Sequence, residues 1–211
     1  MKSTLFNMVT VLFCITLVAS AGVGAVNMIT AEPIAASKQK AVEDAILAVL
    51  PAFEQSTAEE MTIDEMPITV HKAVNGNDLV GYAVETMTKN GFNGVVRLMV
   101  GFSPEGQVLN VNVLEQAETP GLGTKMCDEG NPLISSIKGK NLESMKLVDG
   151  RLAVRKDGGD VDALTAATIS SRAYVDAVNR AYMAYKSVVD GTEPTDVSTG
   201  ATKTQKGGNN E

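Results

Sequence analysis

The chain of 211 residues carries 18 Lys and Arg against 25 Asp and Glu, a net charge of −7, with one His, two Cys and no Trp. So acidic a chain argues against a nucleic-acid partner, because such affinity comes mainly from basic side chains that neutralise phosphates. The cysteines form no CxxC pair, so this chain alone builds neither a cysteine-ligated zinc site nor an iron–sulfur cluster. The side chains therefore offer few groups for catalysis, which favours a borrowed cofactor.

Residues 3–31 contain no charged side chain, and the part from Leu5 to Ile29 is mostly Leu, Val, Ile, Ala, Phe and Met. About 20 apolar residues span a bilayer as a helix, so the pattern predicts one transmembrane anchor over residues 1–31. A cleaved signal peptide is the alternative, because residues 19–21 read Ala-Ser-Ala and match a cleavage site. The apolar run continues past this site, which favours the uncleaved anchor.

The charges that flank this apolar run predict the orientation of the chain. Lys2 precedes the run and Glu32 is the first charge after it, which favours a cytoplasmic N-terminus. We therefore expect a single-pass protein of the cytoplasmic (inner) membrane with an extracytoplasmic domain over residues 32–190. Residues 191–211 contain almost nothing apolar, which predicts a disordered tail.

Between anchor and tail the hydrophobic pattern predicts helix, then strands, then helix. Apolar residues recur at helical spacing from Val42 to Phe53, and Pro51 is expected to end the helix. His71, in an alternating run, is expected as an exposed strand residue rather than a ligand. An α+β fold follows, an antiparallel sheet packed with helices. Its expected parts are strands at 79–85, 95–102 and 108–114, a hairpin at Asp149-Gly150, and a helix over 173–189.

Just before this last helix, residues 162–171 read Asp-Ala-Leu-Thr-Ala-Ala-Thr-Ile-Ser-Ser. The segment places four hydroxyl side chains at the start of a helix. Hydroxyls and free backbone N–H groups converge there, and the helix dipole favours an anion such as a phosphate. A hydroxyl N-cap without any ligand is the alternative interpretation.

A second segment, residues 118–125, reads Glu-Thr-Pro-Gly-Leu-Gly-Thr-Lys. Its glycines on either side of Leu122 allow the backbone to approach a flat ligand. Thr119, Thr124 and Lys125 offer donors, as does the Gly123 N–H. Pro-Gly also marks an ordinary turn, so the segment alone is weak evidence. The hypothesis is that it forms the opposite wall of the ligand site.

Together with Gly158-Gly159, the two segments resemble the FMN-binding domain of the G subunit of the Rnf electron-transport complex. The same domain occurs in the C subunit of the sodium-pumping NADH:quinone reductase. The N-terminal span and the residues at 81–85 and 91–94 are also similar to the Rnf subunit, so the resemblance covers residues 1–190. The family pattern is Asp-x-x-Ser/Thr-Gly-Ala-Thr-x-Ser/Thr, in which the last threonine of Gly-Ala-Thr is esterified to FMN. That threonine is Thr168 here, and the chain departs from the pattern at Ala166, usually Gly.

The resemblance implies covalently attached FMN as the cofactor and an FMN transferase that moves it from FAD onto the threonine. It implies an electron-carrying subunit of an ion-translocating ferredoxin:NAD oxidoreductase complex, with other membrane subunits as partners and no separate catalytic site or metal. The implied cofactor-binding residues come from the two segments: Thr165, Ala166, Ala167, Thr168, Ser170 and Ser171, with Glu118, Thr119, Leu122, Gly123 and Lys125.

Other interpretations stay open at this point. The chain could belong to a sodium-pumping NADH:quinone reductase or another membrane flavoprotein, or be a non-redox anchored binding module. Thr202 is a second attachment candidate, because residues 196–202 read Asp-Val-Ser-Thr-Gly-Ala-Thr with the glycine included. That segment has no predicted strand before it and no helix after it, so we favour Thr168.

Overall fold

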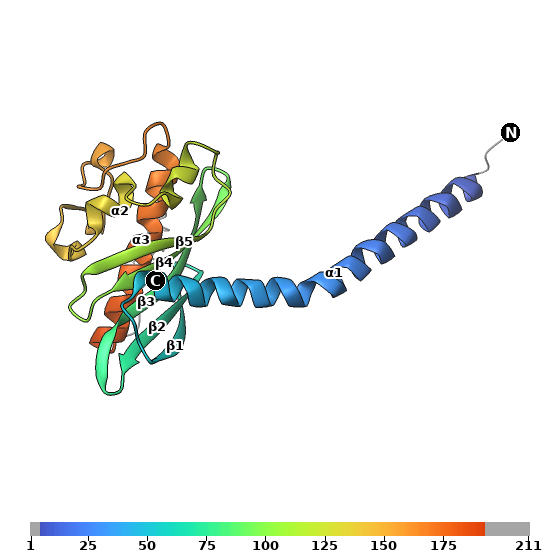
Figure 1. Ribbon diagram of the computed structural model, residues 1–211. Coiled ribbons are helices and arrows are strands. Elements are labelled where there is room, and N and C mark those ends of the chain that lie inside the picture. Colours follow the sequence, from blue (N-terminus) through green and yellow to red (C-terminus); the bar gives the residue numbers. More distant parts are fainter. Residues whose placement is uncertain (1–4, 193–211) are drawn as a thin grey trace, which may run out of the picture. The chain divides into compact units, whose positions relative to one another are not determined.

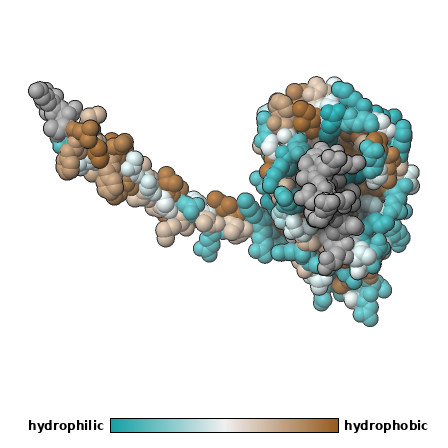
Figure 2. Space-filling model, turned by 180° about the vertical axis from the view of Figure 1, so that it is seen from behind, coloured by the Kyte–Doolittle hydropathy of each residue, from teal (hydrophilic) through white to brown (hydrophobic). Residues whose placement is uncertain are grey.

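The computed structural model describes residues 5–192, which divide into two compact units between Glu43 and Asp44. Helix α1 (Leu5–Val49) begins in the first unit and ends in the second. Its apolar N-terminal half is exposed (Figure 2), and the helix is long and apolar enough to cross a membrane. The sequence predicts a span and a separate later helix, whereas the structure has one continuous helix with Pro33 inside it. Residues 1–4 and 193–211, the latter with Thr202 and nearly all of the tail predicted over 191–211, lie outside the described part.

The second unit is built on a five-stranded antiparallel sheet whose strands follow one another in chain order (Figure 1). The three predicted strands fall within β3, β4 and β5, which confirms the α+β class. The first strand, β1, escapes the hydrophobic pattern because nearly all its side chains are exposed. The strands are β1 (Gln55–Ile63), β2 (Met66–Asn75), β3 (Asp78–Gly91), β4 (Gly94–Phe102) and β5 (Val108–Glu115).

Helix α3 (Thr168–Asp190) packs on one face of this sheet. Alternate residues of β3 point toward the helix, and the buried Thr86 Oγ1 donates a hydrogen bond to the Ala177 carbonyl at 3.1 Å. Small side chains on the helix allow this close approach; they are fully buried at Ala173, Ala177, Ala181 and Ala184. The predicted alanine line therefore faces the sheet.

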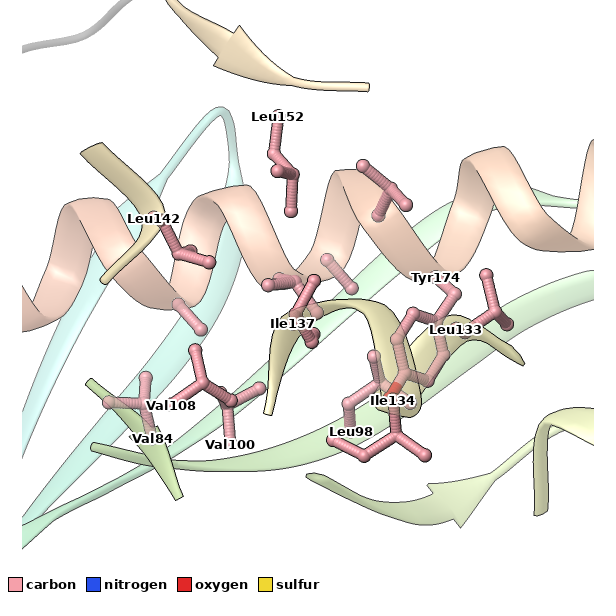
Figure 3. Packing of buried hydrophobic residues seen from close by; sticks show 14 of the residues in the cluster. Val84, Leu98, Val100, Val108, Leu133, Ile134, Ile137, Leu142, Leu152 and Tyr174 are labelled. Carbon is pink, nitrogen blue, oxygen red and sulfur yellow. The ribbon is translucent and has the colours of Figure 1, made fainter. Parts of the chain in front are cut away.

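Short elements complete the core on the same face (Figure 3). Helix α2 (Pro132–Ile137) contributes Leu133 and Ile137 to the core, in the same cluster as Leu98 of β4 and Tyr174 of α3. Asn131 caps α2, since its side chain accepts from the N–H groups of residues 133 and 134. The remaining elements are η1 (Gly123–Cys127), η2 (Leu142–Ser144), β6 (Leu147–Val148), β7 (Arg151–Leu152) and η3 (Arg155–Asp157).

The opposite face of the sheet is covered by the last turn of α1. A Cβ on Gly101 would lie only 2.2 Å from the Val49 carbonyl oxygen, so a glycine is required for the helix end to rest on β4. Asn110 of β5 donates a side-chain hydrogen bond to the Ala48 carbonyl at 3.0 Å. The sheet is therefore enclosed between α3 and the end of α1.

Two tight turns use left-handed backbone conformations. The predicted Asp149-Gly150 hairpin is confirmed: it joins β6 to β7, with φ of 51° and 75° at the two residues. The turn between β1 and β2 has the same φ signs at Asp64 and Glu65, 51° and 60°, without a glycine. Asp64 accepts a hydrogen bond from the buried Arg180 at 3.1 Å, which ties this strained turn to α3.

These two strained residues should respond oppositely to glycine. Glu65 is exposed, so Glu65→Gly should relieve the left-handed backbone and raise the free energy of unfolding by up to about 1 kcal/mol. Asp64→Gly gives the same relief but removes one acidic partner of Arg180, which also pairs with Asp176, and should lower the free energy of unfolding by about 2 kcal/mol. Urea denaturation of the full chain in detergent, followed by circular dichroism, measures both. Equal stabilisation by both changes would show that the Asp64–Arg180 pair contributes nothing.

Candidate functional site

Helix α3 begins on a tight turn rather than on a hydroxyl cap. The N-cap residue is Ala167, so the hydroxyl N-cap expected as the alternative to a ligand is absent there. Its N–H donates to the Leu164 carbonyl at 3.2 Å, which closes a four-residue turn, and Ala166 within it has a φ of 59°. Thr168 is the first helical residue and is partly exposed. The first N–H groups of a helix have no intrahelical partners, so they are available beside its side chain.

The other hydroxyls of the segment have different places. Ser171 is fully buried, donates to the Ala167 carbonyl at 2.8 Å and accepts from the Leu164 N–H at 2.9 Å. Ser171 therefore stabilises the turn over residues 164–167 from the buried side. Thr165 lies exposed within the turn.

A cavity of about 290 Å³ lies at the start of α3. Three segments far apart in sequence line it: the β3–β4 hairpin, the loop after β5 and the helix start. The structure thus brings the two predicted segments together, as expected for opposite walls of one site. The lining residues are Phe92, Thr119, Leu122, Gly123, Ala166, Ala167, Thr168, Ile169 and Ser170.

Glu118 and Lys125, both predicted to bind the ligand, are not among the lining residues. The Glu118 side chain is 3% exposed and accepts hydrogen bonds from the Ser170 hydroxyl and, at 3.3 Å, from the Asn93 N–H. The Glu118 carboxylate therefore contacts residues of the hairpin and of α3 and does not line the cavity. Lys125 is exposed, and its backbone N–H donates to the Leu122 carbonyl in η1.

Charged groups near the helix start are engaged in ion pairs. Arg172, in the first turn of α3, binds Asp157 through two contacts of 2.7 and 2.5 Å, and this hydrogen bonding holds the pKa of the Asp157 carboxyl below its usual value. Asp162 pairs with Arg155 at 2.5 Å. The lining itself consists of hydroxyls, backbone and apolar side chains. An anion there would be held mainly by N–H and hydroxyl donors at the positive end of the helix dipole.

Large apolar side chains stand exposed at this cavity: Phe92 is 61% exposed, Ile169 46% and Leu122 39%. Sequence reasoning places only Leu122 in the site. Phe92 lies between Gly91 and Gly94 at the tip of the β3–β4 hairpin, and this glycine-flanked aromatic residue is the signal that could have found it. Ile169 follows Thr168 directly. The apolar part of a ligand therefore has three large side chains to contact at this cavity.

The left-handed conformation of Ala166 predicts the effect of glycine there. Ala166→Gly should raise the free energy of unfolding by up to about 1 kcal/mol, because glycine adopts this φ without strain. The control Ala173→Gly, inside α3, should lower it by about 1 kcal/mol. Urea denaturation compares the two. A loss of stability in Ala166→Gly as large as that in Ala173→Gly would contradict a strained turn.

Comparison with known proteins agrees with this geometry. The family model of the FMN-binding domain matches residues 91–183, which include the hairpin tip, the loop and the helix start. The G subunit of the ion-translocating oxidoreductase complex of Shewanella loihica is 41% identical over 123 residues, 58% of this chain and 57% of the relative. The corresponding G subunit of Erwinia tasmaniensis is 44% identical over 101 residues, 48% of this chain and 47% of the relative.

The chain therefore spans about half the length of these two relatives. The match to the G subunit of Yersinia pestis is longer, with 35% identity over 165 residues that cover 74% of this chain and 78% of the relative. A likeness of this extent, together with the FMN-binding model, confirms the resemblance seen in the sequence. The chain belongs to the family of G subunits of ion-translocating oxidoreductase complexes.

Proposed function

We propose that this chain carries electrons through FMN bound covalently to Thr168, as the membrane-anchored flavoprotein subunit of an ion-translocating oxidoreductase complex. The observation that supports this most directly is the cavity in which Thr168, at the start of α3, meets Leu122 and Phe92. The helix start at Thr168 suits a phosphate, and the apolar side chains that line the same cavity suit a flat ring.

The residues present fit the phosphate of FMN. Thr168 is partly exposed, so its hydroxyl is accessible to a transferase. A phosphoester at the first residue of a helix lies where free N–H groups and the helix dipole favour negative charge. Attachment through the phosphate leaves the ring free for the pocket to tune. The tether also retains the cofactor outside the cytoplasm.

The opening of the cavity suits a carrier of electrons, because large apolar side chains stand exposed around it. Its volume of about 290 Å³ is at the lower end of the range for pockets that enclose most of a small ligand, about 300–1,000 Å³. Part of the flavin would therefore remain at the surface beside Phe92, Leu122 and Ile169. Bound FMN supplies reversible electron transfer, and an exposed ring edge allows exchange with another protein of the complex.

The relatives are named as subunits of ion-translocating oxidoreductase complexes, which supports other membrane subunits of such a complex as partners. By the family resemblance, electrons would pass between ferredoxin and NAD, coupled to ion movement. Maturation would need an FMN transferase that uses FAD. The relatives' names favour this complex over the sodium-pumping NADH:quinone reductase.

The membrane arrangement is part of the proposal. Residues 1–31 would stay as a single-pass anchor in the cytoplasmic membrane, and residues 32–190 would form the extracytoplasmic domain. The exposed apolar side chains of α1 from Leu5 to Ile29 support the anchor, because water does not favour so long an apolar surface.

Replacement of Thr168 tests the attachment. Thr168→Ala, produced with an FMN transferase, should give a folded, colourless protein that lacks the flavin mass, because the acceptor hydroxyl is gone. Thr202→Ala and Thr165→Ala, which remove hydroxyls of the rival motif and of the exposed turn, should stay yellow. Intact-mass spectra and in-gel flavin fluorescence after denaturation measure the bond. Flavin fluorescence retained by denatured Thr168→Ala would refute the assignment.

Cys127 reports the side of the membrane. It is exposed, whereas Cys14 lies in the apolar span. In a Cys14→Ser chain, a membrane-impermeant maleimide should label Cys127 in cells with a permeabilised outer membrane and an intact inner one. Partial desolvation of its sulfur, and then the neighbouring Asp128 carboxylate, raise the pKa of the Cys127 thiol, so labelling should quicken as the pH rises above neutral. Labelling only after inner-membrane lysis would place the domain in the cytoplasm, and a mature mass that begins at Gly22 would refute the anchor.

A further inference from the structure

The tip of the β3–β4 hairpin carries Phe92, whose side chain, at 61%, is the most exposed large apolar one among the described residues of the second unit. It lines the same cavity as Thr168 and Leu122 but comes from a different part of the chain. Aromatic rings stack on flat partners at short range, so this side chain is well suited to the face of a flavin ring. Phe92 can stack on a bound ring only if the hairpin that carries it is held in place.

A buried carboxylate holds the hairpin tip. Glu118 Oε1 accepts from the Asn93 N–H at 3.3 Å, one residue after Phe92, while Oε2 accepts from the Ser170 hydroxyl of α3. Glycines on both sides allow this arrangement. A Cβ on Gly91 would lie 2.6 Å from Glu118 Oε1, and one on Gly123 would lie 2.7 Å from Glu118 Cβ. One carboxylate therefore joins hairpin, loop and helix.

A second contact ties the base of the hairpin to the same helix. Asp176 of α3 accepts hydrogen bonds from Thr88 Oγ1 at 2.6 Å and from Asn90 Nδ2 at 3.0 Å. Asp176 also pairs with Arg180 at 2.6 Å. The hairpin is thus fixed to α3 on either side of Phe92, by side chains at its base and by Glu118 at its tip.

We propose that Phe92 forms an aromatic wall that packs on the isoalloxazine ring, and that Glu118 is the positioning residue that holds this wall from behind. The inference rests on the proposed function and assigns the ring side of the same site. It also revises the role expected for Glu118 from the sequence, because the carboxylate faces Asn93 and Ser170 rather than the cavity.

The protein has no tryptophan, so a single indole can report contact with the ring. An indole in van der Waals contact with an excited flavin donates an electron to it and quenches its fluorescence. Phe92→Trp in the full chain, loaded by an FMN transferase in detergent, should shorten the flavin fluorescence lifetime several-fold. Leu147→Trp, at another exposed apolar position, is the matched control and should leave the lifetime unchanged.

Changes at Glu118 in the Phe92→Trp chain test the positioning role. Glu118→Gln keeps an oxygen for the Asn93 N–H and an amide that can donate to the Ser170 hydroxyl, so quenching should persist. Glu118→Ala releases the hairpin, and the lifetime should recover toward that of the parent. Ser170→Ala is a milder change and should give partial recovery of the flavin fluorescence lifetime. It replaces Glu118→Ala in the test if that variant does not fold.

An intact-mass spectrum of each denatured chain separates the two hypotheses. A parent chain without flavin on Thr168 would refute the proposed function. Flavin attached at Thr168 with an unchanged lifetime in Phe92→Trp would refute the aromatic wall alone. Quenching in Phe92→Trp that persists when Glu118 or Ser170 is replaced by Ala would leave Phe92 in place and refute the role of Glu118.

Discussion

The packing of α3 against β3 and β4 is the contact on which the site depends. Small alanines bring the helix close to the sheet, and Thr86 and Asp176 fix its position along β3. Because the helix cannot slide, its first residue, Thr168, stands beside the hairpin that connects these same two strands. The start of α3 therefore becomes part of a site only because the helix is held at this position on the sheet.

Burial of the Glu118 carboxylate has a desolvation cost that must be offset by hydrogen bonds. The Asn93 N–H and the Ser170 hydroxyl provide them, and the two come from the hairpin and the helix. A polar group satisfied in this way fixes the segments that supply its partners, since movement of either segment leaves one buried carboxylate oxygen without its donor. The cavity walls are therefore held in position by a group that does not line the cavity, as preorganised sites require.

The sequence predicts the parts whose signal is local. Alternation predicts β3 to β5, and Asp149-Gly150 predicts a hairpin. The hydroxyl-rich segment before the last helix contains Thr168, which lines a cavity in the structure. The rest depends on tertiary contacts. The exposed strand β1 has no apolar alternation, and α2 is a short helix that the pattern does not reveal, although Asn131 caps it. In sequence a carboxylate beside a glycine loop resembles a ligand-binding group, and only the fold shows that Glu118 faces inward.

The departure of this chain from the family pattern now has a physical interpretation. The position that is usually glycine is Ala166, whose φ is 59°, a conformation that costs a residue with a Cβ about 1–2 kcal/mol. Ser171, bonded to both ends of the turn, stabilises that conformation, so alanine is tolerated without loss of the turn. The left-handed backbone of this turn is therefore a physical reason for a glycine at this position of the pattern. The rival motif at residues 196–202 contains the glycine of the pattern, but the sequence predicts no helix after it.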